Sequence, residues 1–384
     1  MQKMQKVRGA MKFACAAAVL VLSGCSLFAS KPPSNPPAAL VEFKPGVTVH
    51  TAWTASVGSA GTYAFTPAVS SASVYAASAD GTVSRLDAAT GASVWRINAG
   101  MKLTAGVGTD GLTVAVAGEK GVVLAYDAEG KLRWKAQTSS EVLSSPAVGQ
   151  GLVIVRSLDN RITAFDADSG ERRWTAQRSV PALTLRSAPG ILIVPQAAFV
   201  ALPGGRLSAL NLANGGPWWE MAIGDPRGTT ELERVADASG MPLLIGHDVC
   251  AVAYQGRVGC FDAGSGTAHW VKNFSSDVGV GADDRNLYAA DEHGVVNAFT
   301  RDNGAVVWRN TQLANRGLSS PVTLGSAVVV GDFEGYIHFL SREDGALIGR
   351  VRVDKSAVLP NSVVVGPNVI FQTKLGTLIA LATE

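Results

Sequence analysis

A short motif that recurs about every forty residues constrains the fold of this chain more than any other feature. In its clearest form an apolar residue, Leu86, is followed by Asp87, by Gly91 and, four residues later, by Trp95. Such a repeat indicates a series of similar structural units that pack against their neighbours. Related versions run through a glycine to Trp134, Trp174, Trp219, Trp270 and Trp308, and a last version ends at Gly349, where the tryptophan is missing.

The residues between the motifs predict β-strands. Charged residues make up only 17% of the chain and glycine is abundant at 42, whereas short runs of Val, Thr, Ala and Leu alternate with Gly, Asp and Asn. Each unit reads as three strands, then the Asp-to-Gly turn, then a strand that carries the tryptophan. The Asp can cap free N–H groups and the Gly can adopt a positive φ, while the Trp is expected to wedge between sheets. The motif therefore has a structural role and is not expected to be catalytic.

Four antiparallel strands per unit are typical of a β-propeller blade, so the fold class is all-β and the architecture an eight-bladed β-propeller. The final unit lacks its fourth strand, and the first tryptophan, Trp53, precedes any complete unit. We therefore expect the N-terminal strand around Val49 to Ala55 to complete the C-terminal blade and close the ring. The count of eight follows from the turn before each third strand, at Gly81, Gly121, Asn160, Gly205, Gly256, Gly294, Gly335 and Gly376.

The N-terminus has the pattern of a bacterial lipoprotein signal. Four basic residues precede a short apolar run, which is too short for a stable membrane span, and Leu22-Ser23-Gly24-Cys25 resembles a lipobox. Residues 1–24 are then a signal peptide, 25–46 a lipidated, Pro-rich tether and 47–384 the propeller. Ser26 after the lipidated Cys25 favours a lipid anchor in the outer membrane. The alternative is an ordinary signal peptide with an incidental cysteine.

Charge and motif content exclude several function classes. Removal of residues 1–24 takes away four basic and no acidic residues, so the formal charge of +2 becomes −2, and no basic patch for nucleic acid is left. No P-loop or Gly-x-Ser-x-Gly sequence occurs. We expect no enzyme activity, no metal and no cofactor. The five histidines lie in different units without metal-type spacing, at positions 50, 247, 269, 293 and 338.

Two cysteines of the body, Cys250 and Cys260, flank the turn-like Gln255-Gly256. A two-residue turn would place the two thiols on opposite faces of the hairpin. A loop that differs by one residue would bring them together, and an oxidising compartment would then allow a disulfide. The sequence leaves both possibilities open.

Two adjacent connections between units are longer than the rest. The distance from Trp to the next turn is 31 residues after Trp174 and 37 after Trp219, against 24 to 28 elsewhere. Both should emerge on one face, where function usually resides. The first contains Leu183, Leu185 and Arg186. These are either strand residues with inward leucines or a partner interface, where arginine is enriched.

The second long connection contains Glu231, Glu233 and Asp237. Its acidic residues either solvate a loop or attract a basic partner surface.

The pattern from Asp87 to Trp95 resembles the tryptophan docking motif of the pyrroloquinoline quinone dehydrogenases, which are eight-bladed propeller enzymes. Those enzymes carry a vicinal Cys-Cys disulfide and a carboxylate-bound Ca²⁺, and this chain has no Cys-Cys pair. Fold does not imply function. A quinoprotein and a glycan-binding propeller lipoprotein are nevertheless the alternative functions. A glycan site would need an aromatic platform, and in the only adjacent pair, Trp218-Trp219, the second ring belongs to the docking motif.

Three further stretches resemble the BamB family of propeller lipoproteins, which act in outer-membrane β-barrel assembly. They are "VPALTLR" ending at Arg186, "TELERVADAS" around Asp237 and "GDFEGYIHFL" at Gly331 to Leu340. The resemblance covers nearly the whole chain. Where relatives have an Asp-x-Asp pair, this sequence has Asp237 and Ser239, which leaves half of the acidic contact in doubt.

The resemblance implies a non-catalytic scaffold, anchored by lipid to the outer membrane and facing the periplasm. It would bind the POTRA domains of BamA, meet other lipoproteins of the complex through BamA and act on unfolded outer-membrane proteins. Leu183 and Leu185 would make an apolar contact and Arg186 a charge-assisted bond. Asp237 would bind a basic or amide group of the partner. POTRA sheet edges make β-augmentation one docking mode.

Overall fold

The computed structural model describes residues 35–179 and 181–384. The predicted signal peptide 1–24 and Cys25 therefore lie outside the described residues, as does Val180. Residues 38–384 form one compact unit. In the part of the chain described, no helix combines the length and apolarity needed to cross a membrane.

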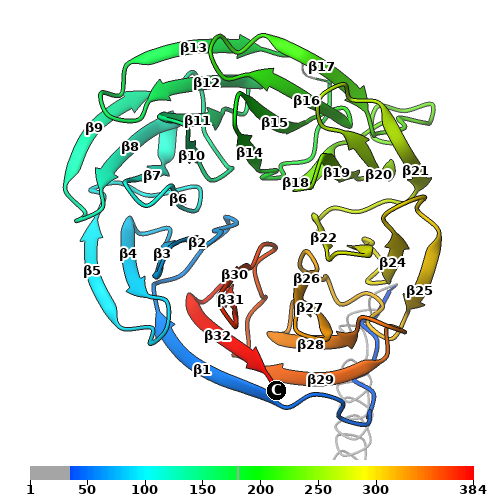
Figure 1. Cartoon of the computed structure of the whole chain (residues 1–384). Coiled ribbons are helices and arrows are strands. Elements are labelled where there is room, and N and C mark those ends of the chain that lie inside the picture. The colour runs from blue at the N-terminus through cyan, green and yellow to red at the C-terminus, as the bar shows by residue number, and fades with distance from the viewer. Residues whose placement is uncertain (1–34, 180) are drawn as a thin grey trace, which may run out of the picture. The chain divides into compact units, whose positions relative to one another are not determined.

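The unit is a ring of eight four-stranded antiparallel sheets, which confirms the predicted fold class (Figure 1). Blades 1 to 4 contain β2 (Ala68–Ser70), β3 (Ser73–Ala77), β4 (Thr82–Asp87), β5 (Ser93–Asn98); β6 (Gly108–Thr109), β7 (Thr113–Ala117), β8 (Val122–Asp127), β9 (Leu132–Gln137); β10 (Ala147–Gly149), β11 (Leu152–Arg156), β12 (Arg161–Asp166), β13 (Arg172–Gln177); β14 (Ile191–Val194), β15 (Ala197–Leu202), β16 (Arg206–Asn211), β17 (Pro217–Ala222). A short 3₁₀ turn, η1 (Glu119–Gly121), precedes β8.

Blades 5 to 8 contain β18 (Ala238–Ile245), β19 (Asp248–Ala253), β20 (Arg257–Asp262), β21 (Ala268–Asn273); β22 (Val280–Ala282), β23 (Asn286–Ala290), β24 (Val296–Thr300), β25 (Val306–Asn310); β26 (Val322–Leu324), β27 (Ala327–Gly331), β28 (Tyr336–Ser341), β29 (Leu347–Arg352); β30 (Val363–Val365), β31 (Asn368–Gln372), β32 (Thr377–Thr383) and β1 (Val49–Ser56). In every blade the first strand faces the central channel and the fourth lies outermost.

The N-terminal strand closes the ring as predicted. β1 pairs with β32 in the order β1-β32-β31-β30, with Val49 opposite Thr383 and Ser56 opposite Thr377. The backbones of Thr48 and Glu384 exchange two further hydrogen bonds. Figure 1 shows the first and last strands of the chain side by side in the same blade. Because the ring is closed, every blade has a neighbouring blade on both sides. This protects the sheet edges from association.

Each tryptophan of the motif joins its blade to the next one. The indole Nε1 of Trp53 donates to the carbonyl of Ala88, the residue after the motif Asp of blade 1, at 2.9 Å. The ring packs on Gly91, where an added Cβ would lie 2.6 Å from the indole. Gly91 also has φ +70°, so both space and backbone require glycine there. An equivalent bond, from the indole Nε1 to a backbone carbonyl of the next blade, is made by Trp95, Trp134, Trp174, Trp219, Trp270 and Trp308.

The missing eighth tryptophan has a structural reason. Gly349 faces blade 8, whose third and fourth strands, β32 and β1, are the two ends of the chain rather than the arms of one turn. No Asp-to-Gly turn exists there to receive an indole. Val47 and Val49 pack instead against the position of Gly349, where their methyl groups would lie 3.3 and 3.1 Å from an added Cβ.

Seven of the eight predicted turn positions have a positive φ, from Asn160 at 62° to Gly81 at 98°. In blade 5 the left-handed residue is Gln255 (φ 46°) rather than Gly256. The loop there has three residues, because β19 ends at Ala253 and β20 begins at Arg257. The expectation for a two-residue turn is therefore wrong. Cys250 lies directly opposite Cys260, and the two form a disulfide buried in blade 5.

A segment before β1 is fastened to blade 7. The N–H of Ala38 donates to Ala314, and its carbonyl accepts a bond from Arg316 at 2.9 Å. Arg350 donates to the carbonyl of Val41 and stacks over the ring of Phe43 at 5.0 Å. The N–H of Gly46 donates to Ile348. We call residues 38–46 the strap.

The "GDFEGYIHFL" stretch supplies the base of this attachment. Asp332 is fully buried, and its Oδ2 accepts a bond from Arg316 Nε at 2.7 Å and lies 2.9 Å from His338 Nε2. Arg316 also pairs with Glu334. A buried carboxylate with two partners holds the guanidinium in the orientation that reaches the strap.

Replacement of Trp53 by Ala should lower the free energy of unfolding by about 3–5 kcal/mol, because it removes a buried indole from the closure of the ring. Urea denaturation followed by circular dichroism measures this. Trp218→Ala is the matched control, since Trp218 is 44% exposed and docks on no glycine. Its effect should stay within about 0.5 kcal/mol. Equal losses in the two variants would contradict the docking role.

Acid should weaken the turns of the motif. Hydroxyl and backbone donors of Thr90, Ser169 and Ser265 lower the pKa of Asp87, Asp166 and Asp262, respectively. A lowered folded-state pKa means that the stabilisation is complete above the unfolded value of 3.8 and is lost as pH falls through the folded value. In blade 4 the motif position is Asn211, whose side-chain oxygen accepts the N–H of Ala213, so asparagine can also form this turn.

The triple variant Asp87→Asn, Asp166→Asn, Asp262→Asn should therefore fold and lose less stability than the native chain between about pH 5 and about pH 2.5. Urea midpoints across that range provide the measurement. Parallel acid profiles of the two proteins would rule out these turns as the origin of acid sensitivity.

Candidate functional site

The two long connections lie next to each other on one face, as predicted. They join β13 to β14 and β17 to β18, so both lead from the outer strand of one blade to the inner strand of the next (Figure 1). The N–H of Gly190, at the end of the first, donates to the carbonyl of Gly240 in β18 at 3.0 Å. The carboxylate of Asp237 reaches back to Leu185. The two connections therefore form one continuous surface.

Residues 181–190 are irregular and belong to no strand of the propeller. The interpretation of Leu183 and Leu185 as inward-facing strand residues is therefore wrong. Leu183 is 47% exposed and Leu185 is half-buried. An exposed leucine in an irregular loop is available for an apolar contact.

The guanidinium of Arg186 is exposed and held in place by the neighbouring blade. Its Nη2 lies 2.8 Å from Glu141 Oε2, in the connection that enters blade 3, and the Arg186 side chain is 64% exposed. The hydroxyl of Tyr63 donates to the other oxygen of Glu141 at 3.4 Å. Burial and the Glu141 charge raise the pKa of Tyr63, which keeps its hydroxyl protonated as a donor. Three connections thus meet at Arg186.

Asp237 has a different position from the one the sequence predicts. The sequence predicts direct contact with a partner, whereas the side chain is only 2% exposed. One carboxylate oxygen accepts the N–H of Leu185 and the other accepts the N–H of Gly204 at 2.8 Å. Burial raises the pKa of Asp237, and these two N–H groups oppose that shift. In this structure the carboxylate fixes the Leu183–Arg186 loop from beneath.

A buried cation lies near this carboxylate. Arg156 is 7% exposed, and burial lowers its pKa to about 10, while the charge of Asp237 acts in the opposite direction. Ser239, at the position where the BamB resemblance implies a second acid, is also buried, and its hydroxyl donates to the carbonyl of Asp237. Both positions of the pair therefore point into the protein in this structure.

The tip of the second connection is a compact turn with an exposed leucine. Glu233 accepts the N–H groups of Thr229 and Thr230, which lowers its pKa to about 2. Glu231 pairs with Arg234. The acids are thus engaged within the loop, while Leu232 between them is 72% exposed. Leu232 was not among the residues predicted from the sequence, although an isolated leucine flanked by two glutamates is a usable signal.

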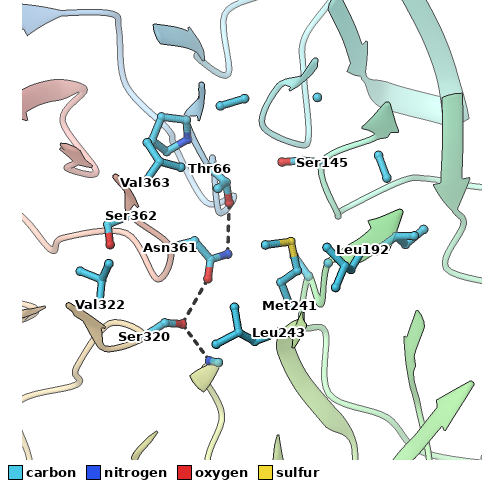
Figure 2. A pocket seen from close by; sticks show the side chains of 18 of the residues that line it. Thr66, Ser145, Leu192, Met241, Leu243, Ser320, Val322, Asn361, Ser362 and Val363 are labelled. Atoms are coloured by element: carbon cyan, nitrogen blue, oxygen red, sulfur yellow. Dashed lines mark hydrogen bonds between the residues drawn. The ribbon is translucent and has the colours of Figure 1, made fainter. Parts of the chain in front are cut away.

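The central channel holds a cavity of about 490 Å³, lined by the innermost strands (Figure 2). Asn361 donates to Thr66 and accepts a bond from Ser320, each at 3.2 Å, and Met241 projects beside them. None of the described lining residues is ionisable, so they supply no general acid or base. Among residues 35–179 and 181–384, no group of three His, Cys, Asp or Glu side chains is arranged to hold a metal ion.

Comparison with known proteins gives one consistent family. The family profile described as outer membrane protein assembly factor BamB matches residues 79–310 and 292–384. The BamB of Bordetella pertussis is 47% identical over 362 residues, 94% of each chain. The BamB of Burkholderia pseudomallei is 44% identical over 370 residues, covering 96% of this chain and 97% of its own.

Solved structures agree with this result. The crystal structure of BamB from Moraxella catarrhalis has a TM-score of 0.81 at 26% identity, covering 87% of this chain and all of that one. The quinohemoprotein alcohol dehydrogenase of Comamonas testosteroni has a TM-score of 0.66 at 14% identity, covering 87% of this chain and 76% of that one. The second likeness shows the fold alone.

Asp237→Ala should release the Leu183–Arg186 loop. The N–H groups of Leu185 and Gly204 lose their acceptor, so the free energy of unfolding should fall by about 1–3 kcal/mol. Amide hydrogen exchange should accelerate at Leu185 and Gly204 and stay unchanged at the buried strand β27 of blade 7. Unchanged exchange at Leu185 would show that the carboxylate does not hold this loop.

Proposed function

The chain belongs to the BamB family of outer membrane protein assembly factors, and from this membership we propose that it is a non-catalytic scaffold which binds the periplasmic POTRA domains of BamA. The family places the protein in the outer-membrane assembly machinery. The surface that carries the contact is the pair of long connections between β13 and β14 and between β17 and β18. The single observation that carries this proposal is the exposed guanidinium of Arg186, which is held by Glu141 of the connection that enters blade 3.

Arg186 has the physical features of an interface anchor. A guanidinium that is already oriented loses less conformational freedom when a partner binds. The Glu141 carboxylate neutralises part of its charge but uses only one edge of the planar group. The other donors can bond to a carboxylate or carbonyl of the POTRA domain.

The leucines supply the apolar part of the contact. Leu183 stands exposed three residues before Arg186, and Leu232 is exposed on the adjacent connection. Leu232 is flanked by Glu231 and Glu233, and Leu183 is followed by Arg186, an arrangement that fits the apolar centre and polar rim of a protein interface. Leu185 is half-buried and anchors the loop rather than filling a pocket of the partner.

Asp237 acts as a positioning residue in this proposal. Its two carboxylate oxygens tie the backbone of Leu185 to that of Gly204 and so set the distance between the Leu183–Arg186 loop and blade 4. The presence of Ser239 in place of a second acid is compatible with this role, because one carboxylate already bonds both N–H groups.

The loop backbone offers a further mode of contact. Residues 181–184 lie in no sheet, and the backbone bends at residues 182–183, so the segment would have to straighten to pair as a strand. Alignment of this segment along an exposed strand of a POTRA sheet would add main-chain hydrogen bonds to the side-chain contacts. The lipid on Cys25 would hold the protein at the outer membrane, facing the periplasm, where it would assist β-barrel proteins during insertion.

Calorimetric titration tests the proposal. The chain from residue 25, with Cys25→Ser for solubility, is titrated with the POTRA domains of the same organism's BamA. Arg186→Glu should weaken binding by at least about 100-fold, because it removes a charge-assisted bond and places a like charge beside Glu141. Arg309→Glu, an exposed arginine on β25 of blade 6, is the matched control and should bind as the native chain does.

Circular dichroism and urea midpoints show whether the variants remain folded. If Arg186→Glu binds like the native protein, Arg186 is not part of the contact. If the native chain itself does not bind the POTRA domains, the partner is wrong.

A further inference from the structure

A groove lies between blades 3 and 4 on the face opposite the long connections. It is open to solvent, has a volume of about 790 Å³ and is lined by the turns between first and second strands and by the Asp-to-Gly turns. Its walls carry side-chain amides, the carboxylates of Asp166 and Asp168, a guanidinium and one large aromatic ring. The residues that matter are Trp218, Arg173, Asp168, Gln150, Gln196 and Asn211.

Trp218 occupies a position that the repeat exposes. In every blade the residue before the docking tryptophan, or before Gly349 in blade 7, is the extra residue of a β-bulge. In blade 4, Ala209 pairs with Trp219 and Leu210 with Pro217, so Trp218 has no partner across the ladder. A bulge redirects its side chain away from the sheet. The corresponding residues are Ala52, Val94, Arg133, Arg173, His269, Val307 and Ile348.

Blade 4 alone among these positions carries an indole, and the ring remains 44% exposed. It does not serve as a docking tryptophan, a role that belongs to Trp219, which bonds to Ala263. An exposed ring of this size outside the docking interface offers a flat apolar surface to a ligand.

The arginine across the groove lacks the partner that its equivalent has. In blade 2, Arg133 reaches across to Asp168 of blade 3 at 3.2 Å. Arg173 is the same bulge residue one blade on, but the residue that corresponds to Asp168 in blade 4 is Ala213. Among the described residues, its one ion pair is with Asp166 of its own blade at 3.7 Å, and its side chain is 58% exposed. The groove therefore has a cation without a carboxylate on the opposite wall.

We propose that this groove binds an acidic carbohydrate chain. The flat face of Trp218 would stack on the C–H face of a sugar ring, and the Arg173 guanidinium would pair with a sugar carboxylate. The amides of Gln150, Gln196 and Asn211 both donate and accept hydrogen bonds, which matches the hydroxyl and acetamido groups of saccharides. A single aromatic ring beside three amides and several charged groups fits a sugar better than an apolar peptide anchor, and the other apolar lining residues are Leu152, Leu212 and Ala213.

This site does not depend on the proposed POTRA contact. The groove is built from Gln150 and Gln196, at the turns after the innermost strands, and from the Asp-to-Gly turns, all on one face. The connections that carry Leu183 and Arg186 emerge on the other face. Variants in the groove should therefore leave POTRA binding unchanged, so the two proposals can fail separately.

Calorimetric titration of the chain from residue 25, with Cys25→Ser, tests the inference. Two acidic probes represent two sources of the same chemistry: tetragalacturonate, and a tetrasaccharide of alternating N-acetylglucosamine and N-acetylmuramic acid. The tetramer of N-acetylglucosamine is the neutral probe and hexaglutamate is the acidic peptide probe. We expect at least one acidic saccharide to bind about tenfold more tightly than the neutral one.

Trp218→Ala should weaken binding of that saccharide by about tenfold or more through loss of the stacking surface. Arg173→Gln should remove only the preference over the neutral probe. Val307→Ala, at the same bulge position in blade 6, is the matched control and should bind as the native chain does. Urea midpoints confirm that all three variants fold.

Absence of binding by both acidic saccharides at millimolar concentration would overturn the proposal, as would binding that survives Trp218→Ala. Binding of hexaglutamate in preference to the saccharides would identify the groove as a peptide site instead. Equal binding of acidic and neutral saccharides by the native chain would overturn the acidic specificity.

Discussion

The hydrogen bond from an indole Nε1 to a carbonyl of the next blade is the interaction on which the rest of this structure depends. It occurs at seven blade boundaries, always to the residue after the motif Asp or its equivalent, and each time the ring covers the motif glycine. The Asp shapes the turn that presents the carbonyl, and the Gly leaves room for the ring. One short sequence thus specifies both the turn and the interface between sheets. At the eighth boundary the chain ends replace the turn, and valines replace the indole.

Because the scaffold repeats so regularly, function can reside in its departures. The two long connections, the indole at a bulge position and the alanine that replaces a cross-groove acid all leave the blade packing intact. Asp237 shows how an insertion is integrated. A carboxylate from one connection bonds to the backbone of the preceding one and to blade 4, so that a loop outside every sheet still has a defined position.

The repeat in the sequence was enough to predict the eight blades, their four strands and the closure through β1, because these follow from local periodicity and from one missing strand. The same reasoning could not fix details that depend on a single residue of loop length. Cys250 and Cys260 face each other only because Gln255 takes the left-handed position and the loop has three residues. The burial of Asp237 could not be predicted either, because an acidic loop residue gives the same sequence pattern whether its side chain faces solvent or a backbone N–H. Leu232 stands out only once its exposure is known.

If the proposed lipid anchor holds the protein by its N-terminus, the strap has a mechanical consequence. A pull on the chain ahead of residue 38 would first load the Arg316 and Arg350 contacts and the backbone bonds to Ala314 and Ile348. Arg316 in turn bonds to the buried Asp332, so the force would pass to blade 7. Without these contacts the same force would peel β1 from β32 one pair of hydrogen bonds at a time, starting at Val49. The strap would thus keep a load on the N-terminus away from the β1–β32 hydrogen bonds that close the ring.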